Sequence, residues 1–170
     1  MSPILDDEFD LNRIIIKPLY LGLVVNVLVP MAILLVCYFL DKNQSWFNRI
    51  GEGANTLFYA IVAVSLAQAA VALWWRTQMM KKPMVRSKET FEDDLVHSLV
   101  ARSKPIFYLI ALIALWGFAY FYFTARFEET LMIVLFSFVV FQVVRPRFGF
   151  ARSLIKAQKE LVEKGVVIRD

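Results

Sequence analysis

The sequence predicts an all-α integral membrane protein: four transmembrane helices arranged as two hairpins, with two further amphipathic helices on the cytoplasmic side. Apolar residues make up 59% of the 170 residues, and the mean hydropathy is +0.57. Soluble domains are usually about 45–50% apolar. The excess is gathered into four long blocks, with most charged residues between them. A chain of this length predicts a single domain, here one membrane domain over residues 1–170.

Each apolar block is long and continuous, without the alternation of a barrel strand. About 20 helical residues cross the hydrocarbon core of a bilayer, and in lipid only helices and closed barrels satisfy the backbone polar groups. The fourth block is the shortest, about 22 Å as a helix, so it must extend at one end or thin the bilayer locally. We predict spans at about 19–40, 55–75, 105–124 and 130–144.

Lys and Arg are distributed unequally among the segments that join the blocks. Sixteen of the 19 lie in the N-terminal segment, the middle loop and the tail, which share one side of a four-span protein. The two opposite loops hold only Lys42, Arg49 and Arg126. Because Lys and Arg are enriched in cytoplasmic loops, we predict that both termini and the middle loop are cytoplasmic.

The middle loop contains a predicted helix of its own. Thr90 stands three residues before Asp93, which is a capping-box pattern. Apolar residues then recur at helical spacing, opposite a charged face. We predict an amphipathic helix over 90–103 that breaks or bends at Pro105.

The tail contains a second amphipathic pattern, over 150–164, followed by Gly165 as a plausible C-cap. Its apolar side can dip into the membrane interface, pack on the inner ends of the spans, or dock on a partner. Its basic residues can meet anionic lipid. The predicted lipid contacts are Arg145, Arg147, Arg152 and Lys156.

The predicted spans contain few polar residues and no ionisable Asp, Glu, Lys, Arg or His. These polar positions favour hydrogen bonds between helices, and the proline predicts a kink in the first span. Alternatively, they line a path for a solute, although coupled transport normally needs an ionisable group. The positions are Asn26, Pro30, Ser65, Gln68, Ser137 and Gln142.

The second span carries a stripe of alanines on one helical face, which lets another helix approach closely. We predict that this stripe packs against a helix of this chain or of a partner. Its members are Ala60, Ala63, Ala67 and Ala70.

Signatures of catalysis, cofactor binding and nucleic-acid binding do not occur in the sequence. It has no phosphate-binding glycine loop and no nucleophile elbow. One His and one Cys cannot form a His/Cys metal cluster within a chain. His97 fits a solvated helix face better than a proton carrier. The carboxylates from Glu89 to Asp94 suit a helix N-terminus better than a divalent-ion site. We expect neither an enzyme nor a cofactor or metal site.

The ends of two spans carry short motifs, Trp75-Arg76-Thr77-Gln78 after the second and Gln142 to Pro146 after the fourth. With these motifs the layout resembles the small four-helix membrane proteins encoded beside ATP synthase, which assist assembly of its rotor ring. The present chain is longer and has an additional tail helix.

These patterns favour a non-catalytic accessory, assembly or scaffold subunit of a membrane protein complex. Its expected partners are the lipid bilayer and other membrane subunits or copies of itself. The expected location is the inner (plasma) membrane of a prokaryote. The alternative is a small homo-oligomeric channel or transporter for an ion or small solute, because four spans are few for a transporter acting alone.

Overall fold

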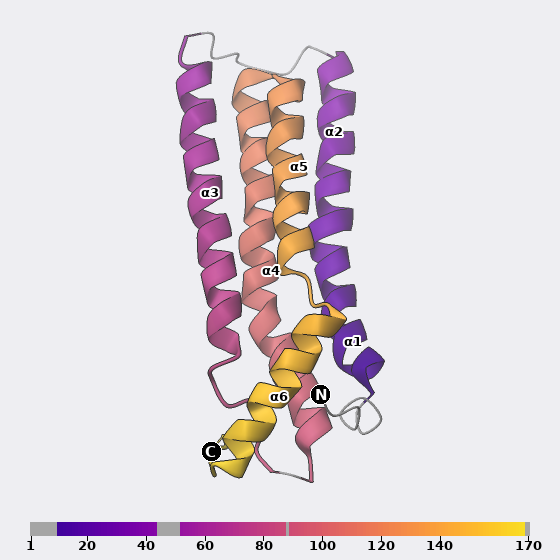
Figure 1. Cartoon of the computed structure of the whole chain (residues 1–170). Helices are drawn as coiled ribbons and strands as arrows, with labels where there is room; N and C mark the ends of the chain where they lie inside the picture. The colour runs from indigo at the N-terminus through magenta and orange to yellow at the C-terminus, as the bar shows by residue number, and fades with distance from the viewer. Residues whose placement is uncertain (1–9, 44–51, 88, 169–170) are drawn as a thin grey trace.

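The computed structural model describes residues 10–43, 52–87 and 89–168, and every regular element in these ranges is a helix. Four helical stretches are long and apolar enough to cross a membrane, namely Leu11–Lys42, Ala54–Met79, Phe91–Thr124 and Phe127–Val144. The predicted all-helical membrane-protein class is confirmed at this level. The elements are α1 (Leu11–Leu23), the π-helical η2 (Val24–Leu28), α2 (Val29–Asn43), α3 (Ala54–Met79), α4 (Phe91–Thr124), α5 (Phe127–Val144) and α6 (Phe148–Glu163) (Figure 1).

The long helices form a bundle in which α4 and α5 are the central pair. The helix formed by α1, η2 and α2 lies on one side of this pair, and α3 lies on the other (Figure 1). The expected pairing of the first two spans as a hairpin is therefore not seen, because α2 and α3 make no extensive contact with each other. By contrast, α4 and α5 are joined by Ala125 and Arg126 alone and pack along each other.

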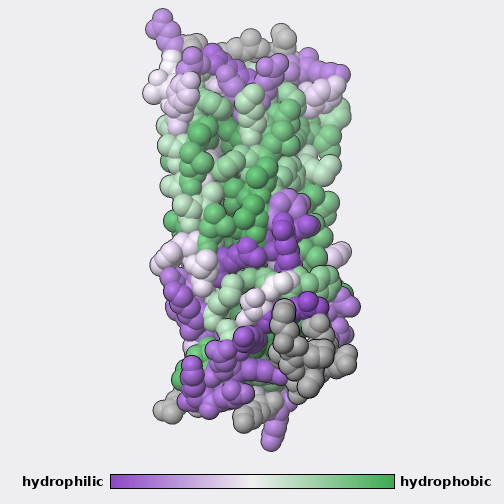
Figure 2. Space-filling view, in the orientation of Figure 1, coloured by the Kyte–Doolittle hydropathy of each residue, from purple (hydrophilic) through white to green (hydrophobic). Residues whose placement is uncertain are grey.

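The two ends of the bundle differ. The start of α1, the segment between α3 and α4, and α6 lie at one end, which we call the basal end (the lower end in Figure 1). At the other, apical end, α2 finishes, α3 begins and α4 turns into α5. On the face shown in Figure 2, an apolar band separates polar residues at the two ends. Large apolar side chains such as Leu28, Leu66 and Val139 are more than half exposed in this bundle, as expected of a surface that contacts lipid rather than water.

The first span contains a π turn where the sequence predicts a kink. The N–H of Val29 bonds to the carbonyl of Val24, five residues earlier. Pro30 follows directly and has no N–H to donate, so a regular helical ladder would be interrupted here. The π turn shifts the register of the hydrogen bonds just before the proline and lets the helix continue.

The sequence predicts a break or a bend at Pro105, between the loop helix and the third span, and the break is not seen. The structure joins 90–103 and 105–124 into the single helix α4. Proline removes one backbone hydrogen bond, but Ser103, Ile106 and Phe107 beside it are buried and hold the helix against its neighbours. At about 51 Å, α4 is far longer than the hydrocarbon core, so its N-terminal part must project beyond the basal side of a membrane.

The shorter helices lie close to their predicted positions. The fourth span extends backwards, as its length required, because α5 begins at Phe127 and reaches about 27 Å. The tail helix α6 ends at Glu163, and Gly165 takes a left-handed φ of 73°. The N–H groups of Gly165 and Val166 bond back to Val162 and Leu161, which closes the C-terminus of α6.

The core contains a tight crossing between the first span and the central pair. The rings of Phe107 and Phe141 meet edge to face at 5.9 Å and are almost fully buried. Gly22 lies against them: a Cβ atom there would be 2.7 Å from the Phe141 ring and 3.0 Å from the Phe107 ring. Only glycine lets the first span approach the two phenylalanines this closely.

Candidate functional site

The most elaborate polar structure lies at the basal end. It combines the segment 80–87, residues 91–104 of α4, and α6, which we call the basal lobe. The segment 80–87 has the composition of a linker, with Pro83 inside a basic run. In the structure it is nevertheless held firmly: Met84 is fully buried and Val85 is 1% exposed.

Gln158 of α6 is the central contact of the basal lobe. Its side chain is 1% exposed. Its Oε1 accepts a hydrogen bond of 2.8 Å from the N–H of Met84, and its Nε2 donates to the carbonyl of Lys82 at 3.1 Å and more weakly to that of Met80 at 3.5 Å. One amide thus supplies partners that a buried irregular segment otherwise lacks.

The long helix α4 holds the same segment from its other side. Ser98 Oγ donates to the carbonyl of Met84 at 2.8 Å, and Arg102 Nη2 donates to that of Pro83 at 2.7 Å. The irregular segment after α6 adds a backbone hydrogen bond of 3.0 Å from the N–H of Ile168 to the carbonyl of Val85. Two helices and the C-terminal segment thus anchor the connection through hydrogen bonds to its backbone.

The start of α4 is tied both to the connection and to α1. The carboxylate of Asp94 accepts hydrogen bonds from the backbone N–H of Arg86 and the hydroxyl of Thr90. Arg13 of α1 pairs with Asp93 at 2.8 Å and with Glu92 at 3.5 Å. Glu92, Asp93 and Asp94 at this helix start are thus engaged by an ion pair and by hydrogen bonds to the connection. The predicted capping box does not form, because the Thr90 side chain makes no capping hydrogen bond to α4.

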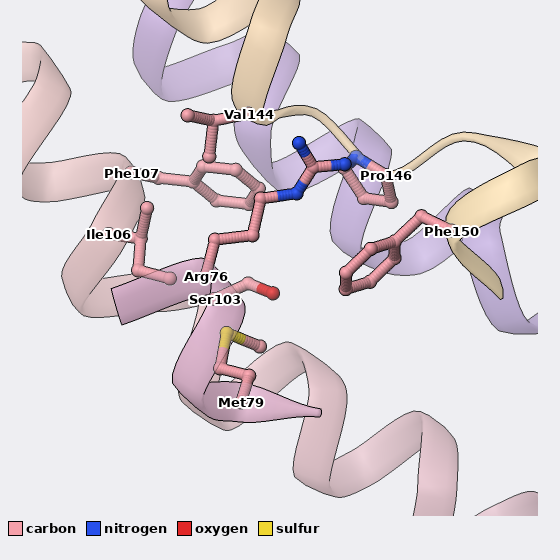
Figure 3. Close-up of a pocket in the computed structure, with 8 residues that line it drawn as sticks. All are labelled: Arg76, Met79, Ser103, Ile106, Phe107, Val144, Pro146 and Phe150. Atoms are coloured by element: carbon pink, nitrogen blue, oxygen red, sulfur yellow. The ribbon is translucent and has the colours of Figure 1, made fainter. Parts of the chain in front are cut away.

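A second contact at the basal end joins α3 to the end of α5 (Figure 3). Arg76 Nη1 donates to the carbonyl of Val143 at 2.6 Å, and its guanidinium lies over the ring of Phe150 at 4.7 Å from the centroid. Arg147 donates to the carbonyl of Gln142 at 2.8 Å. Both carbonyls belong to the last turn of α5, where no further helical N–H reaches them. The two arginines cap α5 and offset the negative end of its dipole.

The apical end has its own polar network, which joins three helices. Tyr120 is fully buried, and its hydroxyl donates to the carboxylate of Glu129. The other carboxylate oxygen of Glu129 accepts from Arg126 at 3.0 Å, and Arg126 also donates to Asn55 Oδ1 of α3 at 2.7 Å. The hydrogen bond and negative charge of Glu129 raise the pKa of the Arg126 guanidinium above its ordinary value.

The predicted intramembrane polar residues are not brought together. Asn26 is fully buried, but its amide bonds to the carbonyl of Gly22 in its own helix, and Ser137 likewise bonds to Val134. Ser65 is 2% exposed, and its hydroxyl has no hydrogen-bond partner among the described residues.

Two further predicted positions lie apart from those. Gln142 is exposed on α5, and Gln68 is half-buried on α3. Asn26 and Gln68 belong to spans on opposite sides of α4 and α5 (Figure 1). Pro30 is buried beside the π turn. The six residues therefore do not line one path within a single chain.

The alanine stripe faces outward. Ala60, Ala63, Ala67 and Ala70 are all exposed. The small residues through which α3 meets its own bundle are instead Ser65, Ala69 and Ala72, which are at most 8% exposed. The second span thus has two small-residue faces, one packed within the chain and one on the surface.

The basic residues predicted to contact lipid have different surroundings. Arg152 and Lys156 are exposed on α6, opposite its buried residues Leu154 and Ile155. Arg147 is exposed but also caps α5, and Arg145 is half-buried, with an Nε that has no partner within the described ranges. His97 is exposed on α4. In the described part of the chain, no three His, Cys, Asp or Glu side chains are grouped so as to hold a metal ion.

Some residues central to this architecture were not singled out by the sequence. Gln158 sits among charged tail residues and reads as a solvated position, although its place between Leu154 and Leu161 at helical spacing is a signal for the inner face. Gly22 is a small residue inside a span, a feature that often marks close helix packing.

Comparison of the chain with models of known protein families, with curated proteins and with solved structures gives no match.

Proposed function

We propose that the protein is a non-catalytic accessory, assembly or scaffold subunit of a membrane protein complex. It spans the membrane four times with its basal lobe in the cytoplasm and packs against other membrane helices. The orientation rests on the Lys and Arg distribution, since sixteen of the 19 lie in the segments of the basal side. An inner membrane of a prokaryote is the proposed setting.

The observation that carries the proposal is the outward-facing alanine stripe of α3. Surfaces that only meet lipid have no need of small side chains, and the neighbouring exposed positions Tyr59, Leu66 and Val71 are large. Small residues four apart, such as Ala63 and Ala67, allow two helix backbones to come close enough for extensive van der Waals contact. Because α3 already uses another face within the chain, this one is available to a helix of another subunit.

The stripe is tested by making it bulky while leaving the fold intact. Ala63→Phe and Ala67→Phe are expected to abolish association of the tagged protein with other membrane subunits in mild detergent. The matched control is Ala32→Phe, since Ala32 is also an exposed alanine, on α2 at the opposite side of the bundle. The control should leave association unchanged. Equal retention of partners by all three variants would refute the role of the stripe.

The basal lobe supplies the second proposed interaction surface. Hydrogen bonds from Gln158, Ser98 and Arg102 hold its connection in place. The exposed face of α6 presents Arg152 and Lys156. A basic face next to a membrane suits anionic headgroups or an acidic surface of a partner. In the scaffold proposal this lobe positions a partner at the membrane, and the alanine stripe holds it within the bilayer.

A further inference from the structure

A groove lies at the basal end of α3, between this helix, Lys82 and Arg102 of α4. It has a volume of about 530 Å³. This size falls within the range of small-ligand sites in proteins, roughly 300–1,000 Å³. Its lining residues are Trp74, Trp75, Gln78, Met79, Lys82 and Arg102.

The depth of the groove follows from the length of α3. About 20 residues suffice to cross the hydrocarbon core, so the core is crossed between Ala54 and about Leu73. Trp74 and Trp75 come next, 61% and 41% exposed, at the headgroup level where tryptophan is favoured. Lys82 and Arg102 lie beyond them on the basal side. One groove thus has an aromatic wall at the membrane interface and cations just outside it.

The charge of the groove is positive and uncompensated. No acidic residue lines it, and within the described ranges neither Lys82 nor Arg102 forms an ion pair with a carboxylate. Arg102 is also fixed in place, because its Nη2 donates to the carbonyl of Pro83 at 2.7 Å. A guanidinium that donates to one carbonyl retains N–H groups for a further acceptor.

We propose that this groove binds the phosphate headgroup of an anionic phospholipid from the leaflet on the basal side. Lys82 and Arg102 contact the phosphate, the amide of Gln78 donates to a headgroup oxygen, and Trp74 and Trp75 flank the upper part of an acyl chain. The proposal rests on the membrane placement given above but not on the accessory role. This binding differs from the general electrostatic attraction between the basic face of α6 and lipid, because the groove would hold a single lipid molecule.

The test is native mass spectrometry of the full chain in mild detergent, titrated with phosphatidylglycerol or with phosphatidylcholine as the neutral comparison. The wild-type protein should retain one phosphatidylglycerol in preference to phosphatidylcholine. Lys82→Gln should weaken that retention about tenfold, the loss of one charge-assisted hydrogen bond. Lys81→Gln is the matched control, because Lys81 is the exposed neighbouring lysine and does not line the groove. It should change the affinity less than twofold.

Three outcomes overturn the proposal. Equal weakening by Lys81→Gln and Lys82→Gln would show diffuse surface charge rather than a site. Displacement of the lipid by inorganic phosphate at constant ionic strength would show a site for free phosphate. Equal retention of both lipids would show that no headgroup is recognised. Lys82→Arg, which keeps the charge, should restore binding and serves as the check that the variants fold. Co-purification of partner subunits should be unaffected by Lys82→Gln, so failure here is distinguishable from failure of the accessory role.

Discussion

Replacing Gln158 by leucine should detach the segment 80–87 from α6. Leucine has a similar volume but neither donor nor acceptor, so the N–H of Met84 loses its partner at 2.8 Å and the carbonyl of Lys82 loses one at 3.1 Å. Met84 is fully buried, so water cannot replace the lost bond without opening the lobe. Leaving one buried donor without a partner costs about 1–3 kcal/mol.

This cost should appear mainly as local opening of the segment 80–87, because the four spans pack independently of Gln158. One decade of equilibrium constant corresponds to about 1.4 kcal/mol, so the amide of Met84 should exchange about one to two decades faster in Gln158→Leu. Hydrogen exchange monitored by mass spectrometry of the detergent-solubilised protein measures this rate. Peptides from the middle of α5 should keep their protection, since that helix is untouched.

Gln142→Leu is the matched control, since Gln142 is an exposed glutamine on α5, away from the connection. It should leave exchange at Met84 unchanged. If Gln158→Leu also leaves the protection of Met84 unchanged, the amide does not hold the basal lobe together and the reasoning about this contact is wrong.

Substitutions at four further positions test the packing, the helix ends and the apical network. Gly22→Val should lower the free energy of unfolding by about 1–3 kcal/mol, because the larger side chain overpacks against the two phenylalanine rings. The change is measured from the unfolding transition in detergent. In contrast, Gly149→Ala should raise the free energy of unfolding by about 0.5–1 kcal/mol, because alanine favours the helix more than glycine does. Nothing lies within 4 Å of the added Cβ. Ala125→Gly should stabilise by about 1 kcal/mol in the same assay, because Ala125 has a left-handed φ of 53°. Glu129→Leu should lower the free energy of unfolding by about 1–3 kcal/mol, because the buried hydroxyl of Tyr120 loses its acceptor. Glu129→Gln keeps an acceptor and should cost less than half as much. Equal effects of the two variants would contradict this explanation.

The four membrane-crossing helices could be predicted from the sequence because long apolar blocks have no other stable structure in lipid. The π turn before Pro30 was anticipated as an irregularity, since the missing N–H of proline is a local property. The continuity of α4 through Pro105 was not predicted, because it depends on the burial of Ile106 and Phe107 against other helices. Local propensity indicates where a helix is weak, and tertiary packing decides whether it breaks.

The arrangement of the helices and the polar contacts between them could be predicted from the sequence less well. Sequence order makes α2 and α3 consecutive, but α4 and α5 lie between them, and only packing specifies this. The alanine stripe was predicted as a packing face, and its outward direction could not be read from periodicity because the opposite face of α3 is also rich in small residues. The contacts of Arg76 and Gln158 join positions 67 and 74 residues away in the chain, a separation at which single-sequence patterns carry no information.

The central claim is that this chain is a subunit of a larger membrane complex. The most direct test is to purify the protein at native abundance in mild detergent and to determine the composition of the particle by mass spectrometry and light scattering. The account predicts that unrelated membrane subunits co-purify in fixed stoichiometry and are lost in Ala67→Phe. A defined oligomer of this chain alone, with no other protein, would contradict the account and favour a homo-oligomeric channel or transporter.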